Sequence, residues 1–405
     1  MNRGAIDFDV AVIGAGSAGL AAAVTAARLG ARTVVLERYG FLGGMGTASL
    51  VHTFCGLYRL EAGTEPVFAN PGFATEMAER MMAATGLPPI RMGRVDVLPQ
   101  HPVEFVRIAD EMVRAEKNLR TSLHVEVTGV SSNDAGWTIK TAERGGSREI
   151  KAAVLVDASG DAVVAGLLGA DSKMTEKPRL QRPAYVFGVH GVAGFGDDSK
   201  LALAGMIVDG VRKAVIPKAA LGMNFRASGR AGELFGTLDL AGAGASAEFD
   251  PLDEACLTDL EIRGRKAAAE VVGFLAKELD GWKSAYVSHW PVRAGVRESR
   301  RWIGEYVLTG DDLLTGRRFD DEIALATWPM EFRETTKGPK LRFPQRNQPA
   351  GIPLRCLIPK GLKRIFVAGR CISTDHEAQA SIRVMGTCFS TGEAAGRSAY
   401  ECKSL

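Results

Sequence analysis

The sequence predicts an α/β fold with two domains, of which the first is built from two separate parts of the chain. A short apolar run, a glycine-rich turn and a helical pattern follow one another near residues 9–29. A strand pattern and a Gly/Ala-rich helix return at residues 364–400. The middle is richer in Lys, Arg and Pro and holds four of the five Trp. We therefore expect a domain from residues 1–165 and 350–405, interrupted by a mixed α+β domain at 166–349.

The first elements form a βαβ unit. Residues 9–13 (DVAVI) are a short apolar run before a glycine, which predicts a buried parallel strand. Residues 17–29 carry small and apolar side chains at helical spacing, and Gly30 follows as a stop signal. Residues 33–36 (TVVL) predict the second strand.

Later elements follow from similar patterns. A glycine-rich loop at 38–46 precedes predicted helices at 73–85 and 103–117. Alternating residues predict strands at 122–130, 137–142 and 149–156, with a hairpin turn between the last two. Farther along we expect a helix at 253–279, a second helix in the Arg-rich stretch after Pro291, a strand at 364–368 and a helix at 386–400.

The Arg-rich stretch places Arg293, Arg297 and Arg301 at intervals of four residues, so that a helix would carry them on one face. Such a face would bind a carboxylate or a pyrophosphate. The alternative is a solvated face that pairs with Glu298 and Glu305.

Composition excludes several classes of protein. The net charge is +3, from 50 basic and 47 acidic residues, which gives no electrostatic reason to expect nucleic acid. The apolar stretch 10–29 is interrupted by glycines and Arg28, unlike a secretory signal or a membrane span. None of the six cysteines is in C-x-x-C spacing, so we expect no metal site, no disulfides and a cytoplasmic location.

The turn after the first strand carries the spacing Gly14-x-Gly16-x-x-Gly19. In a Rossmann-type βαβ unit these glycines permit a tight turn, a close approach to a pyrophosphate, and close packing of helix on strand. Glu37, 18 residues after Gly19, ends the second strand and would accept hydrogen bonds from ribose hydroxyls. The pattern predicts a dinucleotide site and leaves FAD and NAD undistinguished. The alternative is a glycine-rich turn without a ligand.

Three stretches carry a family resemblance. Residues 37–47 (ERYGFLGGMGT) resemble the segment of glutathione-reductase-type FAD proteins in which a Gly-Gly loop runs under the flavin. Residues 156–170 are similar to their Ala-Thr-Gly strand end, with Ser159 in place of Thr. Residues 366–396 resemble the flavin-closing segment of the FAD-dependent oxidoreductase family whose members are often labelled xanthan lyases, and residues 297–321 and 352–361 also resemble that family. The resemblance implies a glutathione-reductase-like FAD-binding Rossmann domain with an inserted substrate domain.

The resemblance and the fingerprint together give an expected set of FAD contacts. In many members of the wider superfamily an acidic residue follows the strand-end glycine, whereas this chain has Arg370. Residues 38–42 hold no histidine for a covalent link, so we expect non-covalent FAD. Thr387 is expected to cap a helix whose N-terminus stabilises reduced flavin, and Gly386 to allow its approach. The expected contacts are Gly14, Ala15, Gly16, Ser17, Ala18, Gly19, Glu37, Arg38, Gly43, Gly44, Met45, Thr47, Val127, Ala158, Ser159, Gly160, Gly369, Arg370, Ser381, Ile382, Gly386 and Thr387.

Four residues are candidates for substrate chemistry. His376 lies between two acidic residues and would take a substrate proton while a hydride moves to flavin N5; the alternative is a structural histidine. His52 and Cys55 follow the Gly-Gly loop and would reach the flavin ring, although a buried cysteine is more often a small hydrophobe. Arg383 lies in the flavin-closing segment and would bind an anion.

These features predict an FAD-dependent oxidoreductase that transfers a hydride between flavin N5 and a small polar or anionic substrate. One alternative is a flavin monooxygenase reduced by NAD(P)H, which the missing Gly-Asp signature and the lack of a second dinucleotide fingerprint disfavour. Another is a flavin-binding component of a multi-protein complex, or an RNA-modifying flavoprotein. We expect no nucleic-acid or membrane partner, and a homodimer is the default assembly.

Overall fold

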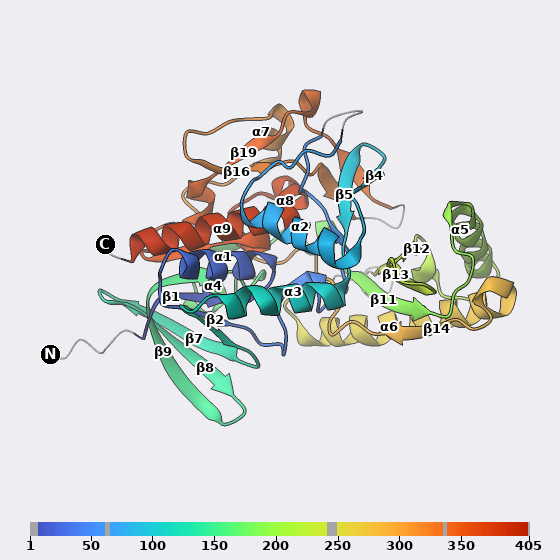
Figure 1. Cartoon of the computed structure of the whole chain (residues 1–405), viewed down its shortest axis with the longest axis horizontal. Helices are drawn as coiled ribbons and strands as arrows, with labels where there is room; N and C mark the ends of the chain where they lie inside the picture. Colours follow the sequence, from blue (N-terminus) through green and yellow to red (C-terminus); the bar gives the residue numbers. More distant parts are fainter. Residues whose placement is uncertain (1–6, 61–64, 241–248, 335–337, 404–405) are drawn as a thin grey trace.

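The computed structural model describes residues 7–60, 65–240, 249–334 and 338–403 (Figure 1). A 7-stranded sheet forms the centre of the main body, with the order β6-β2-β1-β9-β8-β7 and with β20 also paired to β9. Its strands are β1 (Phe8–Ile13), β2 (Thr33–Leu36), β6 (Leu119–Ser122), β7 (Glu126–Asn133), β8 (Gly136–Glu143), β9 (Gly146–Asp157) and β20 (Ile365–Val367). The pairs β6–β2, β2–β1, β1–β9 and β9–β20 are parallel, so the sheet is Rossmann-like.

Strand β9 belongs to two arrangements. Its first half pairs antiparallel with β8, which pairs antiparallel with β7, and these strands project from the main body (Figure 1). Its second half, Val154–Val156, is fully buried between β1 and β20. This continuous apolar run is typical of a parallel strand covered on both faces.

Helices α1 (Ser17–Arg28), α9 (Met385–Cys402), α2 (Phe73–Thr85) and α3 (Pro102–Ala115) cover one face of the sheet (Figure 1). Helices α1 and α9 lie against each other because both carry small residues where they cross. A Cβ atom on Gly392 would lie 2.1 Å from the carbonyl oxygen of Ala18, and one on Gly396 would lie 2.3 Å from that of Ala22. The glycines of α9 therefore allow the backbones of α1 and α9 to pack this closely.

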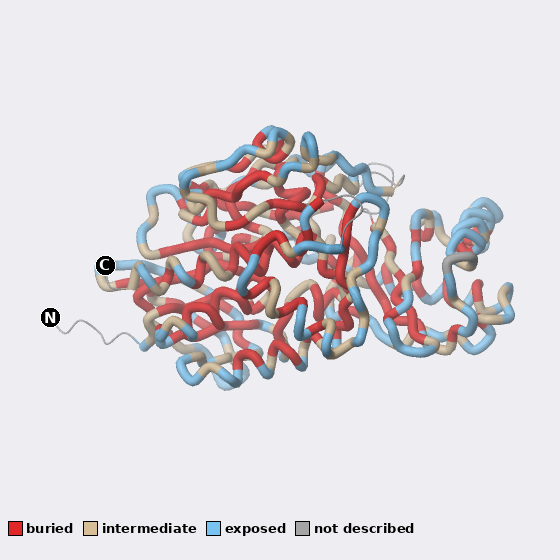
Figure 2. The backbone as a smooth tube through the Cα atoms, turned by 45° about the horizontal axis from the view of Figure 1, so that its top comes forward, coloured by how far each residue is buried: buried red, intermediate tan, exposed pale blue. Residues whose placement is uncertain are grey.

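A second sheet has a core of its own. It is antiparallel with the order β12-β13-β11-β14, and α5 (Asp197–Arg212) and α6 (Glu254–Glu278) lie beside it. The strands are β11 (Ala184–His190), β12 (Asn224–Ala227), β13 (Glu233–Asp239) and β14 (Tyr286–His289). Its buried apolar cluster extends along the chain from Tyr185 to Val296. Figure 2 shows exposed backbone along α5, at the far edge of this part.

Short elements complete the structure, and several lie on the main core. Buried Trp302, Leu308, Met330 and Ile352 pack into the same cluster as the parallel sheet. These elements are β3 (Thr53–Phe54), β4 (Ile90–Met92), β5 (Val95–Pro99), α4 (Val163–Leu168), β10 (Ser172–Lys173), β15 (Arg301–Trp302), α7 (Gly310–Thr315), β16 (Glu322–Ala326), β17 (Met330–Phe332), β18 (Lys340–Arg342), β19 (Ala350–Pro353) and α8 (His376–Ile382). None of the helices in the described part of the chain is both long and apolar enough to cross a membrane.

The predicted helix after Pro291 is wrong. Residues 291–300 form no helix, and Gly295 exchanges two backbone hydrogen bonds with Ala184 of β11, at 2.7 and 2.9 Å. In this pairing the N–H and C=O groups of Gly295 bond to β11, so they are not available for hydrogen bonds within a helix. Glycine is also a poor helix former. The arginines of this stretch therefore share no helical face.

One predicted strand is also divided. The expected strand at 122–130 consists of β6 and β7, separated by a turn in which His124 has φ 57°. This turn connects β6, which pairs in parallel with β2, to β7, which pairs antiparallel with β8. One continuous strand could not make both pairings.

Candidate functional site

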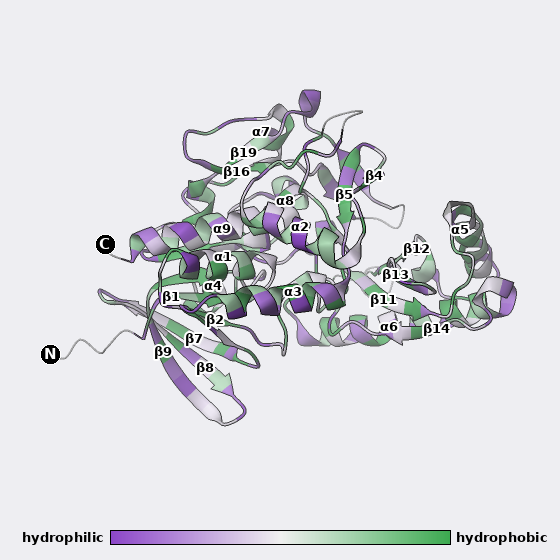
Figure 3. Ribbon diagram, viewed as in Figure 1, coloured by the Kyte–Doolittle hydropathy of each residue, from purple (hydrophilic) through white to green (hydrophobic). Residues whose placement is uncertain are grey.

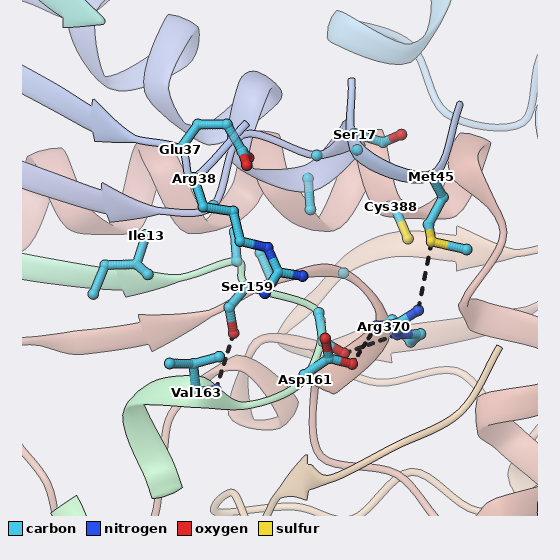
Figure 4. A pocket seen from close by; sticks show the side chains of 18 of the residues that line it. Ile13, Ser17, Glu37, Arg38, Met45, Ser159, Asp161, Val163, Arg370 and Cys388 are labelled. Carbon is cyan, nitrogen blue, oxygen red and sulfur yellow. Dashed lines mark hydrogen bonds and ion pairs between the residues drawn. The ribbon is translucent and has the colours of Figure 1, made fainter. Parts of the chain in front are cut away.

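A cavity lies at the carboxyl ends of β1, β2, β9 and β20; we call it the first cavity. Figure 4 shows Glu37 and Arg38 from the end of β2 on one side, and Ser159, Asp161 and Arg370 on another. Ligands of open parallel sheets bind at this edge. The expected contacts that line it are Gly14, Gly16, Ser17, Ala18, Glu37, Arg38, Gly44, Met45, Val127, Ala158, Ser159, Gly160, Gly369 and Arg370.

The glycine turn before α1 shapes this cavity. Gly14 has φ 88°, and a Cβ atom there would lie 2.8 Å from the carbonyl oxygen of Ala158. A Cβ atom on Gly19 would lie 1.8 Å from the carbonyl oxygen of Gly14, so packing requires both glycines. Gly16 differs, because a Cβ atom there would meet only the Cα atom of Gly44, at 3.8 Å. The space beside Gly16 is open to a ligand.

The N-terminus of α1 suits an anion. Its N-cap is Gly16, no side chain caps it, and its first turn holds no acidic residue. The free N–H groups and the helix dipole at such an end favour a phosphate.

Glu37 is fixed beside this helix end. Its Oε2 atom accepts a hydrogen bond from the Ala15 amide at 2.8 Å, and its Oε1 atom accepts one from the Tyr39 amide at 3.0 Å. The side chain is buried and lines the cavity. Each oxygen keeps lone-pair capacity for a ribose hydroxyl. The uncapped helix end and this oriented carboxylate fit the pyrophosphate and ribose of FAD.

Buried Asp157 orders the opposite wall. It accepts hydrogen bonds from Ser159 Oγ at 2.6 Å and from Trp302 Nε1 at 2.8 Å. Burial raises the pKa of Asp157, although these bonds act to lower it. The carboxyl group thereby fixes the turn from Ala158 to Gly160, which lines the cavity.

Arg370 is held by an acid from another segment. Its guanidinium forms an ion pair with Asp161, and its Nε atom donates to the Gly160 carbonyl at 2.8 Å (Figure 4). Burial acts to raise the pKa of Asp161, but the charges of Arg370 and Arg293 outweigh it, and the pKa is lowered. In many relatives an acidic residue follows the strand-end glycine. In this chain Arg370 has that position, and the acidic residue beside it is Asp161 of the β9–α4 loop.

Other residues of the first cavity have no signal in the fingerprint. They come from strand ends, from the loop after Pro291 and from the start of α9. They are Ile13, Leu36, Tyr39, Val125, Glu126, Asp161, Val163, Arg293, Ala368, Met385 and Cys388. Val125 and Glu126 directly precede the expected contact Val127, so that contact could have indicated them.

The remaining expected contacts support the cavity without lining it. The Thr47 hydroxyl donates to the Leu42 carbonyl at 2.7 Å, and the Ser381 hydroxyl donates to the Trp328 carbonyl at 2.5 Å. A Cβ atom on Gly386 would lie 2.6 Å from the backbone of Gly56, so its close approach is to protein. The residues of this kind are Ala15, Gly19, Gly43, Thr47, Ser381, Ile382, Gly386 and Thr387. The predicted cap at Thr387 is wrong, because α9 begins at Met385 with Val384 as its N-cap.

A second cavity adjoins the first. The two share Met45, Arg370, Arg383 and Met385, and the second extends to the face of β11, β12 and β13. Its charged lining residues are Arg226, Arg297, Arg333, Arg370, Arg383 and Glu331. Basic side chains therefore dominate a site next to the first cavity.

Two of these arginines lack an acidic partner. Arg297 and Arg333 pair with Asp239 at 2.7 and 2.6 Å. Arg226 donates to Thr53 Oγ1 at 3.4 Å, and Arg383 donates to the Glu331 carbonyl at 3.3 Å. Among the described residues neither forms an ion pair, and burial lowers the pKa of both. An anion in this cavity would neutralise them.

His52 and Cys55, which were expected to reach the flavin ring, line the second cavity and not the first. The Nδ1 atom of His52 lies 3.2 Å from the Leu50 carbonyl, and its Nε2 atom is buried without a hydrogen-bond partner in the described structure. Burial and the charge of Arg226 lower the pKa of His52 to about 3. Burial and the charge of Glu331 raise the pKa of Cys55 to about 12. His52 is a neutral imidazole and Cys55 a neutral thiol.

His376 lies elsewhere. Its Nδ1 atom is 3.0 Å from Glu298, which pairs with Arg301 at 2.6 Å, and its Nε2 atom is 2.8 Å from Glu334. It lines neither cavity and instead borders a surface depression with Thr175. Its contacts are those of a buried ion-pair network.

Comparisons with known proteins were made by sequence and by structure. The family model described as FAD dependent oxidoreductase matches residues 9–404. No curated protein sequence matches. Among solved structures, the OxyS anhydrotetracycline hydroxylase from Streptomyces rimosus is 17% identical over 74% of this chain and 54% of its own, with a TM-score of 0.41. A geranylgeranyl bacteriochlorophyll reductase-like protein from Thermoplasma acidophilum is 10% identical over 97% of this chain and 78% of its own, with a TM-score of 0.46.

This chain spans about half the length of the hydroxylase. These similarities to solved structures are low, so the assignment depends on the family model, which covers nearly the whole chain. The chain belongs to the FAD-dependent oxidoreductase family and is an enzyme that uses FAD.

Proposed function

We propose that FAD binds non-covalently in the first cavity and that the enzyme transfers a hydride between flavin N5 and a small anionic substrate in the second. The observation that carries this proposal is the junction of the two cavities at Met45, Arg370, Arg383 and Met385. A cofactor that fills the first cavity and a substrate that fills the second would meet there. When bound, FAD supplies the two-electron chemistry.

The domain division of a glutathione-reductase-like protein is part of the proposal. Residues 1–165 and 350–405 would hold FAD through the Gly14–Gly19 turn, Glu37 and the α1 N-terminus. Residues 166–349 would form the substrate domain. The separate apolar cluster around β11 and α6 supports this division, although Trp302 and Met330 pack with the main core.

The substrate is proposed to carry a carboxylate or a similar anion. Arg226 and Arg383 are half-buried, line the same cavity and have no ion-pair partner among the described residues. Glu331 is the one acidic residue that lines this cavity among the described residues, against five arginines, so a bound carboxylate would supply a further negative charge beside the two unpaired guanidinium groups. The arginines would also orient the substrate toward the cavity junction.

His52 is proposed as the residue that takes a proton from the substrate. An Nδ1–H donor to the Leu50 carbonyl leaves the lone pair on Nε2, which has no partner in the described structure. A neutral imidazole can accept a substrate O–H or N–H proton as the hydride leaves, and an anion bound beside Arg226 would offset the charge that lowers the pKa of His52 in the empty cavity. Cys55 would contribute packing and a weak hydrogen bond, and His376 would position α8.

The first test is the visible spectrum of the purified protein under anaerobic conditions. We expect a yellow protein that releases FAD when it is denatured and whose flavin bleaches with an anionic organic donor. NADH and NADPH serve as the comparison. Rapid bleaching by a nicotinamide, without bleaching by any organic acid, would contradict the proposed donor and favour the monooxygenase. A colourless protein that FAD cannot reconstitute would contradict the cofactor site.

A further inference from the structure

A third cavity, which we call the outer cavity, adjoins the second on the side away from the FAD site. The second and outer cavities share His52, Thr53, Met92, Asn224 and Arg226. The outer cavity is bounded by the hairpin of β4 and β5, by β12 and by α5. The three cavities therefore follow one another, with Arg383 at one junction and Arg226 at the other.

Part of the lining of the outer cavity is apolar and accessible. Ile90 and Met92 of β4, Phe195 before α5 and Ala204 on α5 present apolar surface to it. Leu203, Ile207, Met223 and Phe225 close it from behind and are buried in the core of this domain. Much of α5 is coloured as hydrophobic in Figure 3. An apolar surface of this kind gains free energy when a ligand covers it, by about 25 cal/mol per Å².

The charged groups at this cavity are basic. Arg91, Lys200 and Arg226 line it, and no acidic side chain among the described residues does, although Arg91 pairs with Asp96 beside the cavity at 2.5 Å. Such a lining disfavours a cation and accommodates an anion or an uncharged chain. Arg226 lies where the apolar walls meet the arginine-lined second cavity.

We propose that the outer cavity binds the apolar body of the substrate, and that the substrate is an amphiphilic carboxylate. This inference rests on the proposed function and specifies its substrate class. The anionic group lies between Arg383 and Arg226 in the second cavity. The apolar chain continues past Asn224 and Met92 into the outer cavity. A substrate of this form pairs with the two half-buried guanidinium groups and covers the apolar part of the outer cavity at once.

The experiment measures how affinity depends on chain length. Isothermal titration of the FAD-loaded enzyme compares butanoate, octanoate and uncharged 1-octanol. We expect octanoate to bind at least about tenfold more tightly than butanoate, since each fully buried methylene contributes up to about fourfold. We expect octanoate to bind at least about tenfold more tightly than 1-octanol because of the arginines.

A matched pair of variants locates the chain. Ala204 and Ala202 are both exposed on α5, but only Ala204 lines the outer cavity. Ala204→Trp should reduce octanoate affinity to near that of butanoate and leave butanoate binding unchanged. Ala202→Trp should change neither. Equal flavin content and equal melting temperature of the two variants would show that both are folded.

The outcomes separate this inference from the proposed function. Equal affinities for butanoate and octanoate, or equal losses in both tryptophan variants, would overturn the outer-cavity assignment and leave the anion site intact. Equal affinities for octanoate and 1-octanol would overturn the amphiphilic carboxylate and count against the proposed anionic substrate as well.

Discussion

Arg370 and Asp161 form a buried ion pair that joins the segment after β20 to the loop after β9. The two side chains are 10% and 13% exposed, and both line the first cavity. The Ser299 hydroxyl also donates to Asp161, at 2.6 Å, so three separated segments meet at this carboxylate. The wall of the first cavity thus depends on one acidic group.

Asp161→Asn removes this charge and leaves Arg370 and Arg293 without it. Breaking one side of a buried pair costs about 3–5 kcal/mol, so we expect a clear fall in the free energy of unfolding and partial loss of FAD. Melting temperature and the ratio of flavin to protein absorbance measure both effects. Exposed Asp134 provides the control, and Asp134→Asn should change neither value. Native values in the Asp161 variant would show that the pair has no such role.

Substitutions at Gly16 and Gly14 should affect different properties, ligand binding in the first case and folding in the second. Gly16 has φ −67° and open space beside it, so Gly16→Val should fold normally while its side chain occupies the ligand's place. Gly14 has φ 88° and is packed against Ala158, so Gly14→Val should be poorly folded. Circular dichroism and FAD titration test the pair. A Gly16→Val protein that retains native FAD affinity would refute the site.

The sequence identified the parts of the site that lie close together along the chain. The glycine spacing, Glu37 and the turn after β9 are each defined by a few consecutive residues, and the structure brings them to one cavity. Asp161 and Arg293 could not be found in this way. Arg293 reaches the cavity only because Gly295 pairs with Ala184, a contact across more than a hundred residues.

His376 illustrates how neighbours in sequence mislead. Asp375 and Glu377 suggested a carboxylate that tunes its pKa. In the structure Asp375 caps α8, and the partners of His376 are Glu298 and Glu334. A helix N-cap turns its side chain toward the backbone N–H groups of its own first turn, away from the adjacent residue. The acidic residues that do pair with His376 are distant from it in sequence, so no local sequence pattern indicates them.

Arg226→Met should make the protein more stable and the anion site weaker. Methionine fills similar space without a half-buried charge, so we expect the free energy of unfolding to rise, by at most about 1 kcal/mol. Loss of a charge-assisted hydrogen bond should weaken butanoate binding by about tenfold or more. Calorimetry measures both quantities, with exposed Arg114→Met as the control. Unchanged butanoate affinity would count against Arg226 as an anion ligand.

His376→Asn should affect stability and not flavin chemistry. Burial opposes protonation, but the hydrogen bond and charge of Glu298, and then Glu334, outweigh it and raise the pKa of His376. Its stabilising contribution is therefore complete below the ordinary value of 6.5 and is lost as pH rises through the raised pKa. The melting temperatures of native and variant enzyme should differ most at acidic pH and converge at alkaline pH. A large fall in kcat with an unchanged melting temperature would indicate a catalytic role.

His52 should have the opposite pH dependence. Its pKa falls from 6.5 to about 3 on folding, so the unfolded chain binds a proton between these values and the folded chain does not. The contribution of neutral His52 to the free energy of unfolding is fully present above pH 6.5. It decreases as pH falls, by about 2 kcal/mol at pH 5. His52→Phe keeps the ring that stacks on Phe235 and removes the titration. Between pH 7 and pH 5 the free energy of unfolding of this variant should therefore fall by about 2 kcal/mol less than that of the native enzyme.

The same variant tests the proposed proton acceptor. His52→Phe should retain FAD, because His52 does not line the first cavity, and should lose most of its turnover with an anionic donor. Exposed His190→Phe should match the native enzyme in stability profile and in turnover. A His52→Phe protein with native pH dependence would mean that the histidine is solvated. Native turnover would mean that another group takes the proton.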